Sequence, residues 1–291
     1  MLKQDAPAGR TMTAAPYRFG TISFTYPDWK GSFYPKKAAA DSLLERYARV
    51  FDFLEIDNTA YRAPKTEVVQ SWVDQTPDAF TFGVKLRNSL TQPGKLADLA
   101  GAGAEEFGWF VDRLAPMKEA GKLGPIVALF PKWMRPDKYG DAFLAWLDAL
   151  PQGYQWAIEL RHASWRDPEA PYLEAMRARG AGLVWSVLDG LEVPEEMTAD
   201  GWVYSRLMGD RELEKFDKIQ RTRDDDITTW AAKQRALGSA LSTSYVAVSN
   251  RFEGFAPQTV RRVQEALGAT PTDLAPAAFE SDKPTLESFG E

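Results

Sequence analysis

The chain has no cysteine and only one histidine among its 291 residues. Without cysteine there can be no disulfide, no thiolate metal site and no thiol nucleophile. The one histidine, His162, cannot build the paired imidazole sites that hold zinc or non-haem iron. These absences exclude the cysteine-dependent enzymes and the metalloenzymes that need several histidines.

The sequence also lacks a long apolar run and an excess of positive charge. Residues 1–16 have no continuous apolar stretch of the kind found in a secretory signal, and no run approaches transmembrane length. We therefore expect a cytoplasmic protein that does not enter the membrane. The net charge of −6 argues against general attraction to nucleic-acid phosphates. A hydrophobic content of 44% is enough for a sizeable core.

Strand-like runs alternate with helix-like segments along most of the chain, as in repeated βα units. Eight strands are predicted, at Tyr17–Phe24, Phe53–Asp57, Phe80–Leu86, Pro125–Phe130, Trp156–Arg161, Leu183–Leu188, Trp202–Leu207 and Ser244–Asn250. Helices are predicted between them, at residues 42–51, 67–75, 104–120, 138–150, 168–180, 226–237 and 257–268. The pattern predicts an α/β fold with a single (β/α)8 barrel of the TIM type.

The predicted barrel occupies residues 17–268. Residues 1–16 are expected to form a disordered extension, and residues 269–291 a mobile tail, because neither shows periodicity. An open doubly wound sheet is the alternative. Its phosphate-binding glycine fingerprint is missing after the first strand, where the sequence reads SFTYPDWKG.

Charged residues stand at the ends of several predicted strands. Because side chains alternate between the two faces of a strand, Glu55 shares a face with Asp57, and Glu159 with Arg161. On the seventh strand we expect Tyr204 and Arg206 to point inward, rather than Ser205 and Leu207. The inward charged set is Glu55, Asp57, Lys85, Glu159, Arg161, Asp189 and Arg206. Active sites of such barrels lie at this end of the strands, so the set predicts a ligand site.

The same set has a simpler interpretation, a network of ion pairs that orders the interior of the barrel. In the functional interpretation, Glu159 transfers a proton, Asp189 is its charge partner, and Lys85 with Arg206 clamps an anion. His162 is a further catalytic candidate, although a lone histidine is also a common structural residue. Carboxylates could hold a magnesium ion, but the interleaved basic residues oppose it, so we expect no cofactor.

Aromatic residues crowd the loops after the strands, where they could stack on a ligand or simply seat the loops. The ligand contacts expected here, together with Glu55, Asp57, Lys85, Arg161 and Arg206, are Tyr26, Trp29, Tyr61, Trp165 and Asn250.

Several short segments, taken together, also match the sequence pattern of a known family. They are YPDWKGSFYP (26–35), LEIDNTAYRAP (54–64), FTFGVKL (80–86), LGPIVALFP (123–131), IELRHASW (158–165), Asp189 and YSRLMG (204–209). In this order and spacing they resemble the domain of unknown function 72 family, also called YecE-like, from about Gly20 to Leu267. The resemblance implies a TIM-like barrel and supplies no reaction.

The chain departs from the pattern of that family at five polar positions. Gln92 and Met208 stand where the family has histidine, Leu129 replaces glutamine, Asp57 replaces asparagine, and Ser249 replaces the first of two asparagines. Loss of two imidazoles removes groups suited to proton transfer near neutral pH. The resemblance therefore implies altered or absent turnover in this member.

We expect an enzyme that acts by acid–base chemistry on a small polar molecule, anionic or sugar-like, at the C-terminal rim of the barrel. A hydrolase, lyase or isomerase fits this chemistry. The alternative is a non-catalytic protein that binds a small ligand. A third interpretation, a nucleic-acid processing barrel, draws on the rim aromatics and the basic stretch Arg206–Arg223, which acidic residues interrupt. Oligomeric state is not predicted.

Overall fold

The computed structural model describes residues 17–92, 102–167, 169–209 and 212–274. The predicted extension 1–16 and the part of the predicted tail beyond residue 274 lie outside these ranges. No helix in the described ranges is both long enough and apolar enough to cross a membrane.

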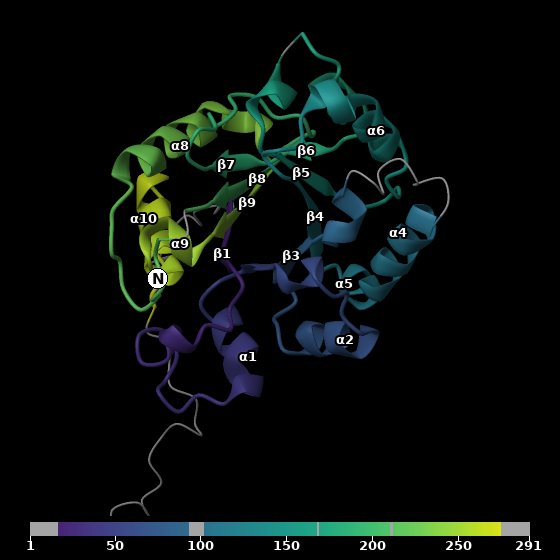
Figure 1. Cartoon of the computed structure of the whole chain (residues 1–291). Coiled ribbons are helices and arrows are strands. Elements are labelled where there is room, and N and C mark those ends of the chain that lie inside the picture. Colours follow the sequence, from purple (N-terminus) through teal and green to yellow (C-terminus); the bar gives the residue numbers. More distant parts are fainter. Residues whose placement is uncertain (1–16, 93–101, 168, 210–211, 275–291) are drawn as a thin grey trace, which may run out of the picture.

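Parallel strands form a barrel at the centre of the molecule (Figure 1). Their order in the sheet is β6-β5-β4-β3-β2-β1-β9-β8-β7, and all the pairings are parallel. The bounds are β1 Tyr17–Ile22, β2 Phe53–Ile56, β3 Thr81–Lys85, β4 Leu123–Phe130, β5 Trp156–Leu160, β6 Gly182–Leu183, β7 Trp185–Val187, β8 Trp202–Leu207 and β9 Thr243–Val248.

The predicted sixth strand is divided in two at Val184. Its first part, β6, pairs with β5, and its second part, β7, pairs with β8. One continuous piece of chain therefore joins the two ends of the sheet. The prediction of an eight-stranded α/β barrel is confirmed, with β6 and β7 sharing one strand position.

Helices surround the barrel (Figure 1). Their bounds are α1 Leu43–Ala48, α2 Thr66–Asp74, α4 Ala102–Arg113, α5 Ala115–Glu119, α6 Pro136–Asp148, α7 Tyr172–Ala178, α8 Asp224–Ala236, α9 Asn250–Glu253 and α10 Ala256–Ala266. Short 3-10 turns follow several strands, including η1 Pro27–Trp29, η3 Asn58–Ala60 and η5 Ala163–Arg166.

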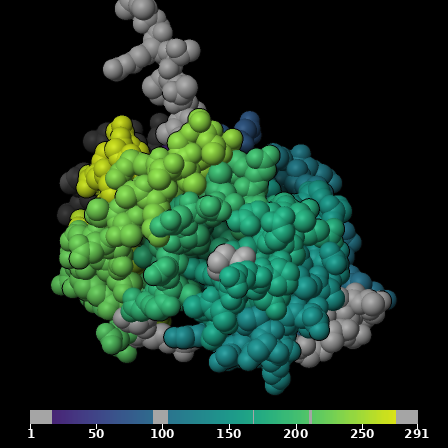
Figure 2. Space-filling model, turned by 90° about the horizontal axis from the view of Figure 1, so that it is seen from above, coloured from purple at the N-terminus to yellow at the C-terminus, as the bar shows by residue number. Residues whose placement is uncertain are grey.

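One helical region differs from the prediction. The predicted helix 104–120 is split into α4 and α5, because Pro116 lacks an amide hydrogen and is tolerated only in the first turn of a helix. Residues 188–201, between β7 and β8, contain no helix, and Gly190 and Gly201 adopt positive φ angles of 77° and 73° there. Beside this segment, a surface hollow of about 440 Å³ lies between α7 and α8, on the face seen in Figure 2.

The segment 269–274 is fastened to α10. The Thr272 amide donates to Gln264 Oε1 at 2.9 Å, and Gln264 Nε2 donates to Thr272 Oγ1 at 2.8 Å. The described domain thus continues past Gly268, where the sequence pattern ended.

Large aromatic side chains fill the lower interior of the barrel. The rings of Phe53, Tyr204 and Tyr245 lie 5.6–6.2 Å apart, and Trp202 packs against Tyr245. Gly83 makes room for them, because a Cβ at this position would lie 2.6 Å from Tyr204 Oη and 2.9 Å from Phe53 Cζ. Because aromatic side chains fill this part of the interior, a ligand site inside the barrel can lie only at the C-terminal end of the strands.

Candidate functional site

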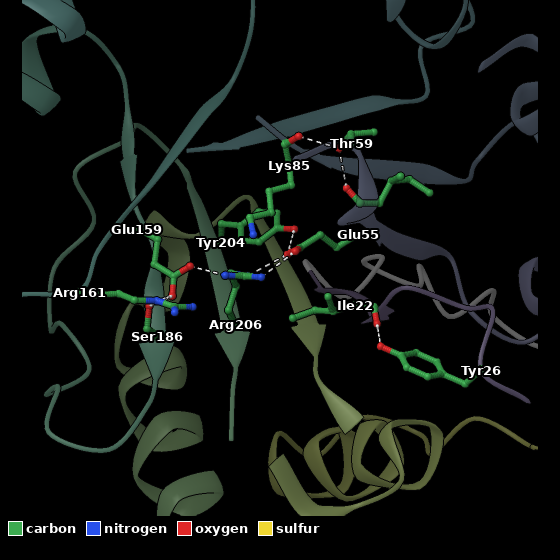
Figure 3. A network of polar contacts seen from close by, with 11 residues as sticks. Ile22, Tyr26, Glu55, Thr59, Lys85, Glu159, Arg161, Ser186, Tyr204 and Arg206 are labelled. Carbon is green, nitrogen blue, oxygen red and sulfur yellow. Dashed lines mark hydrogen bonds and ion pairs between the residues drawn. The ribbon is translucent and has the colours of Figure 1, made fainter. Parts of the chain in front are cut away.

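A buried arginine joins two buried glutamates just above the aromatic layer (Figure 3). Arg206 Nη2 lies 2.8 Å from Glu55 Oε1, and its Nε lies 3.0 Å from Glu55 Oε2. Its Nη1 donates to Glu159 Oε2. The arginine side chain is 3% exposed and both glutamates are 0% exposed. Bidentate pairing of this kind fixes the orientation of all three groups.

Three further side chains complete this arrangement, which we call the paired floor: Glu55, Glu159, Arg161, Ser186, Tyr204 and Arg206. Tyr204 Oη donates to Glu55 Oε2 at 2.8 Å, while Arg161 Nε and Ser186 Oγ donate to Glu159 Oε1 at 3.0 and 3.2 Å. The floor contains two carboxylates and two guanidinium groups, so its formal charges balance. It is an ion-pair network of the kind expected under the structural interpretation.

The pKa values of three floor residues keep their protonation states fixed near neutral pH. Burial opposes the ionisation of Glu159, but Arg206 and Arg161 outweigh it and lower the pKa of Glu159 to about 2. Burial likewise opposes the charge of Arg206, yet Glu159 and Glu55 raise its pKa. Burial, and after it Glu55, raises the pKa of Tyr204 well above 10.0. None of these groups gains or loses a proton near neutral pH.

Two oppositely charged side chains, Lys85 and Asp57, lie above the floor, and we call them the mouth pair. Lys85 is the last residue of β3, and Asp57 directly follows β2, which pairs with β3 as far as Ile56 and Val84. Within the described residues, neither side chain forms a hydrogen bond or an ion pair with another residue, and Asp57 bonds only to its own backbone. Figure 3 shows the Lys85 ammonium pointing inward, toward Tyr204 and Arg206.

The surroundings shift both groups of the mouth pair toward their neutral forms. Burial, and next to it the Arg206 guanidinium, lowers the pKa of Lys85. Burial, and after it the Glu55 carboxylate, raises the pKa of Asp57. A carboxyl group and an amine that are shifted in opposite directions are what general acid–base catalysis needs.

The inward register predicted for β8 is confirmed. Tyr204 and Arg206 both bond to Glu55 inside the barrel. Ser205 faces the other way, where its Oγ accepts hydrogen bonds from Trp230 and Gln234 of α8.

The structure assigns Glu159 and Asp189 roles other than those expected. Glu159 pairs with two arginines, and a carboxylate with a pKa of about 2 neither carries a proton at neutral pH nor accepts one readily. Asp189 is 71% exposed and pairs with Arg223. Arg206, not Asp189, is the charge partner of Glu159. Because Asp189 follows the divided strand, its loop carries it away from the floor.

The predicted aromatic contacts are corrected for two residues. Trp29 and Trp165 are both 0% exposed. The Nε1 of Trp29 donates to Asn250 Oδ1, and that of Trp165 donates to the Met134 carbonyl. Both indoles belong to the hydrophobic core that seats the loops, so they cannot contact a ligand without unfolding it.

Three other predicted contact residues differ in how far they are exposed to solvent. Tyr61 is 76% exposed, and so is free to meet a ligand at the rim. Tyr26 is half-buried; its hydroxyl donates to the Ile22 carbonyl, and burial together with Asp57 raises its pKa to about 12. Asn250 is 1% exposed and holds the β9 end in place, since its Oδ1 accepts from both Trp29 Nε1 and the Ala256 amide.

His162 caps the turn η5. Its Nδ1 accepts a hydrogen bond from the Ser164 amide at 3.2 Å and lies 2.6 Å from Ser164 Oγ. This geometry favours the structural role that a lone histidine commonly has.

Sequence reasoning missed Ser186 and the exposed Trp133. Ser186 lies two residues after the inward Val184, so period-two alternation could have found it. Trp133, 59% exposed, follows β4 at the same rim as Tyr61. In the part of the chain that the structure describes, no group of three or more histidine, aspartate or glutamate side chains is arranged to hold a metal ion.

The two arginines at the ends of the basic stretch Arg206–Arg223 are engaged in ion pairs. Arg206 is inside the barrel, and Arg223 pairs with Asp189 and Asp226. Cations engaged in this way offer little to phosphates, which disfavours the nucleic-acid interpretation.

Comparisons with known proteins agree with this architecture. UPF0759 protein YunF of Bacillus subtilis (strain 168) is 24% identical over 273 residues, which cover 86% of this chain and 95% of that protein. UPF0759 protein YecE of Escherichia coli (strain K12) is 32% identical over 119 residues, 41% of each chain. The crystal structure of a DUF72 family protein from Thermotoga maritima MSB8 has a TM-score of 0.73 at 24% identity, and covers 87% of this chain and 100% of that one.

The Thermotoga structure supports the barrel fold alone, since its identity is low. The family evidence is broader, because the sequence model of the family described as "Protein of unknown function DUF72" matches residues 18–284. That match takes in the paired floor, the mouth pair and all the strands except the first residue of β1. The chain belongs to the DUF72 family.

Proposed function

We propose that this protein is an enzyme that acts by acid–base chemistry on a small polar molecule, with the mouth pair as its proton-transfer groups. The observation that carries the proposal is the contrast between six floor residues that bond to one another and two nearby charged residues that bond to no other residue in the described ranges. Ionisable groups that stay unpaired in a partly buried site are candidates for function. Lys85 and Asp57 thus take over the role first expected of Glu159.

The substrate class follows from the groups that remain free. Lys85 offers three donors, Asp57 offers acceptors, and Arg161 uses only its Nε on Glu159 among the described residues. Such a set matches hydroxyl, carbonyl or carboxylate oxygens on a sugar-like or singly anionic molecule. The exposed Tyr61 and Trp133 at the rim add flat apolar faces on which a sugar ring can stack.

A thermal-shift screen tests the proposal. Sugars, sugar phosphates and organic acids are screened against wild type, Lys85→Met and Asp57→Asn, with the exposed Lys37→Met as the matched control. A ligand present at 100 times its Kd stabilises by about 2.7 kcal/mol, which raises Tm by several degrees. We expect stabilisation of wild type and Lys37→Met, and none of the mouth-pair variants. Equal stabilisation of all four proteins would contradict the proposal.

A non-catalytic ligand-binding protein is the second candidate. It is favoured by the full pairing of Glu159, the only carboxylate besides Glu55 that lies deep in the described barrel interior. Long incubation with a stabilising ligand, followed by product analysis, separates the two candidates. An unchanged ligand would favour binding without turnover.

A further inference from the structure

Lys85 has the surroundings of a nucleophilic amine rather than of a structural cation. A lysine acts as a nucleophile only in its neutral form, which is favoured when the side chain is desolvated and lies next to another cation. Lys85 meets both conditions, because it is largely buried at the end of β3 and its ammonium points toward Arg206. The resulting lowered pKa agrees with this geometry.

The nearby carboxylates Glu55, Glu159 and Asp57 raise the pKa of Lys85, but burial and Arg206 outweigh them. Glu55 is bonded by Arg206 and Tyr204, and Glu159 by Arg206, Arg161 and Ser186. A lysine meant only to balance charge would take one of these carboxylates as its partner. The floor instead satisfies its own carboxylates and leaves the amine free.

We propose that Lys85 forms an imine with an aldehyde or ketone group of the substrate. This inference rests on the proposed function, since it places the substrate carbonyl at the same mouth. The neutral amine attacks the carbonyl carbon, which makes a C–N bond and a carbinolamine. The carbinolamine hydroxyl then leaves as water, taking one proton, and the C=N bond forms. Addition of water later reverses these steps and releases the amine.

Asp57 is placed to supply the proton for the departing water. It directly follows β2, the neighbour of β3, and is close enough to Lys85 for each charge to shift the pKa of the other. Because burial and Glu55 raise its pKa, a larger share of this carboxyl is protonated than of an ordinary aspartate. After water has left, the resulting carboxylate can remove a proton from the carbon next to the imine. The inferred substrates are therefore small hydroxy-carbonyl compounds or keto acids.

Reductive trapping tests the imine. The whole chain is incubated with cyanoborohydride and dihydroxyacetone, glyceraldehyde or pyruvate, and the modified lysines are located by peptide mass spectrometry. Glycerol and lactate, which lack the carbonyl, serve as matched controls. We expect a reduced adduct on Lys85 that forms faster than any adduct on the exposed Lys37. The adduct should be lost in Lys85→Met and in Lys85→Arg, which retains the positive charge, and kept in Lys37→Met.

Labelling of Lys85 no faster than that of Lys37, or no label on Lys85, would overturn the imine. The proposed function fails on a different result, the absence of any Lys85-dependent stabilisation by sugars, acids or carbonyl compounds. If ligands stabilise wild type through Lys85 but leave no adduct, then only the imine is wrong.

Discussion

Each end of the barrel holds a lysine with little exposure to water. One of them is fully hydrogen-bonded within the protein, and the other has no hydrogen-bond partner in the described residues. Lys122, at the N-terminal end of β4, is 4% exposed and donates to the Val73 and Thr76 carbonyls at 2.8 and 2.7 Å, and to Thr76 Oγ1 at 3.3 Å. Lys85, at the C-terminal end of β3, has no partner among the described residues.

The difference in hydrogen bonding indicates a structural role for Lys122 and a functional role for Lys85. Lys122 uses its three protons on acceptors at the C-terminal end of α2, where a cation satisfies free carbonyls and the helix dipole. Its charge is used within the protein. Lys85 lies beside another cation with its donors unused, an arrangement that favours a ligand or a reaction over folding.

Removing Arg206 should have the largest effect on the free energy of unfolding, and it also removes the cation that lies beside Lys85. Arg206→Met leaves Glu55 and Glu159 buried without their main partner, which costs roughly 3–5 kcal/mol. It also frees a carboxylate to pair with Lys85. Chemical denaturation measures the loss, and Arg135→Met, at an exposed ion pair with Asp137, should cost no more than about 1 kcal/mol. Equal losses in the two variants would show that the floor is not a buried ion-pair network.

Acid should weaken the floor by a similar amount. The folded pKa of Glu159, about 2, lies below the ordinary glutamate value of 4.5, so its contribution is present above pH 4.5 and is lost as the pH falls toward 2. The linked stability is about 3 kcal/mol. We expect the free energy of unfolding of wild type to fall more steeply across this window than that of Glu159→Gln. Parallel curves for the two proteins would contradict the assignment.

Lys122→Met sharpens the contrast from the structural end. The substitution leaves the Thr76 carbonyl without its lysine donor and removes one of the donors to the Val73 carbonyl, at a cost of about 1–3 kcal/mol. Ligand binding at the opposite end should not change. Denaturation curves, together with the thermal-shift screen, measure both quantities, and a loss of ligand response in this variant would contradict the separation of the two ends.

Lys85→Met should have the smallest effect on stability, and in the other direction. Because the folded pKa of Lys85 is lowered, its burial costs stability below that pKa, and the loss is regained as the pH rises from the folded pKa to 10.5. Near neutral pH we expect the variant to be equal to wild type or more stable, by at most about 1 kcal/mol. The gain should vanish in alkaline solution. A loss of stability as large as that of Lys122→Met would make Lys85 a structural residue.

The sequence predicted the barrel and most of its inner face because both depend on local periodicity. Alternation placed Glu55, Lys85, Glu159 and Arg206 on one side of their strands, and Figure 3 shows these side chains meeting. The β8 register was predictable for the same reason: only Tyr204 and Arg206 can reach the other polar groups from inside.

What alternation cannot give is the choice of partner. Glu159 could pair with any of several cations, and only three-dimensional distances show that Arg206 and Arg161 both take it. Asp189 was misplaced because the strand before it is divided at Val184 and leads into a loop without a helix. Tryptophan is common both in ligand sites and in hydrophobic cores. Only the packing of Trp29 and Trp165 shows that these two are core residues.

The most direct test of the account is the titration of the Lys85 side chain. In protein labelled with ¹³C-lysine, the Cε signal of Lys85, assigned with Lys85→Met, is followed by NMR as the pH is raised. Burial of the unpaired amine beside Arg206 predicts a pKa below the ordinary lysine value of 10.5. A pKa at or above 10.5 would mean that Lys85 is a solvated or paired cation, and it would contradict both the mouth pair and the imine.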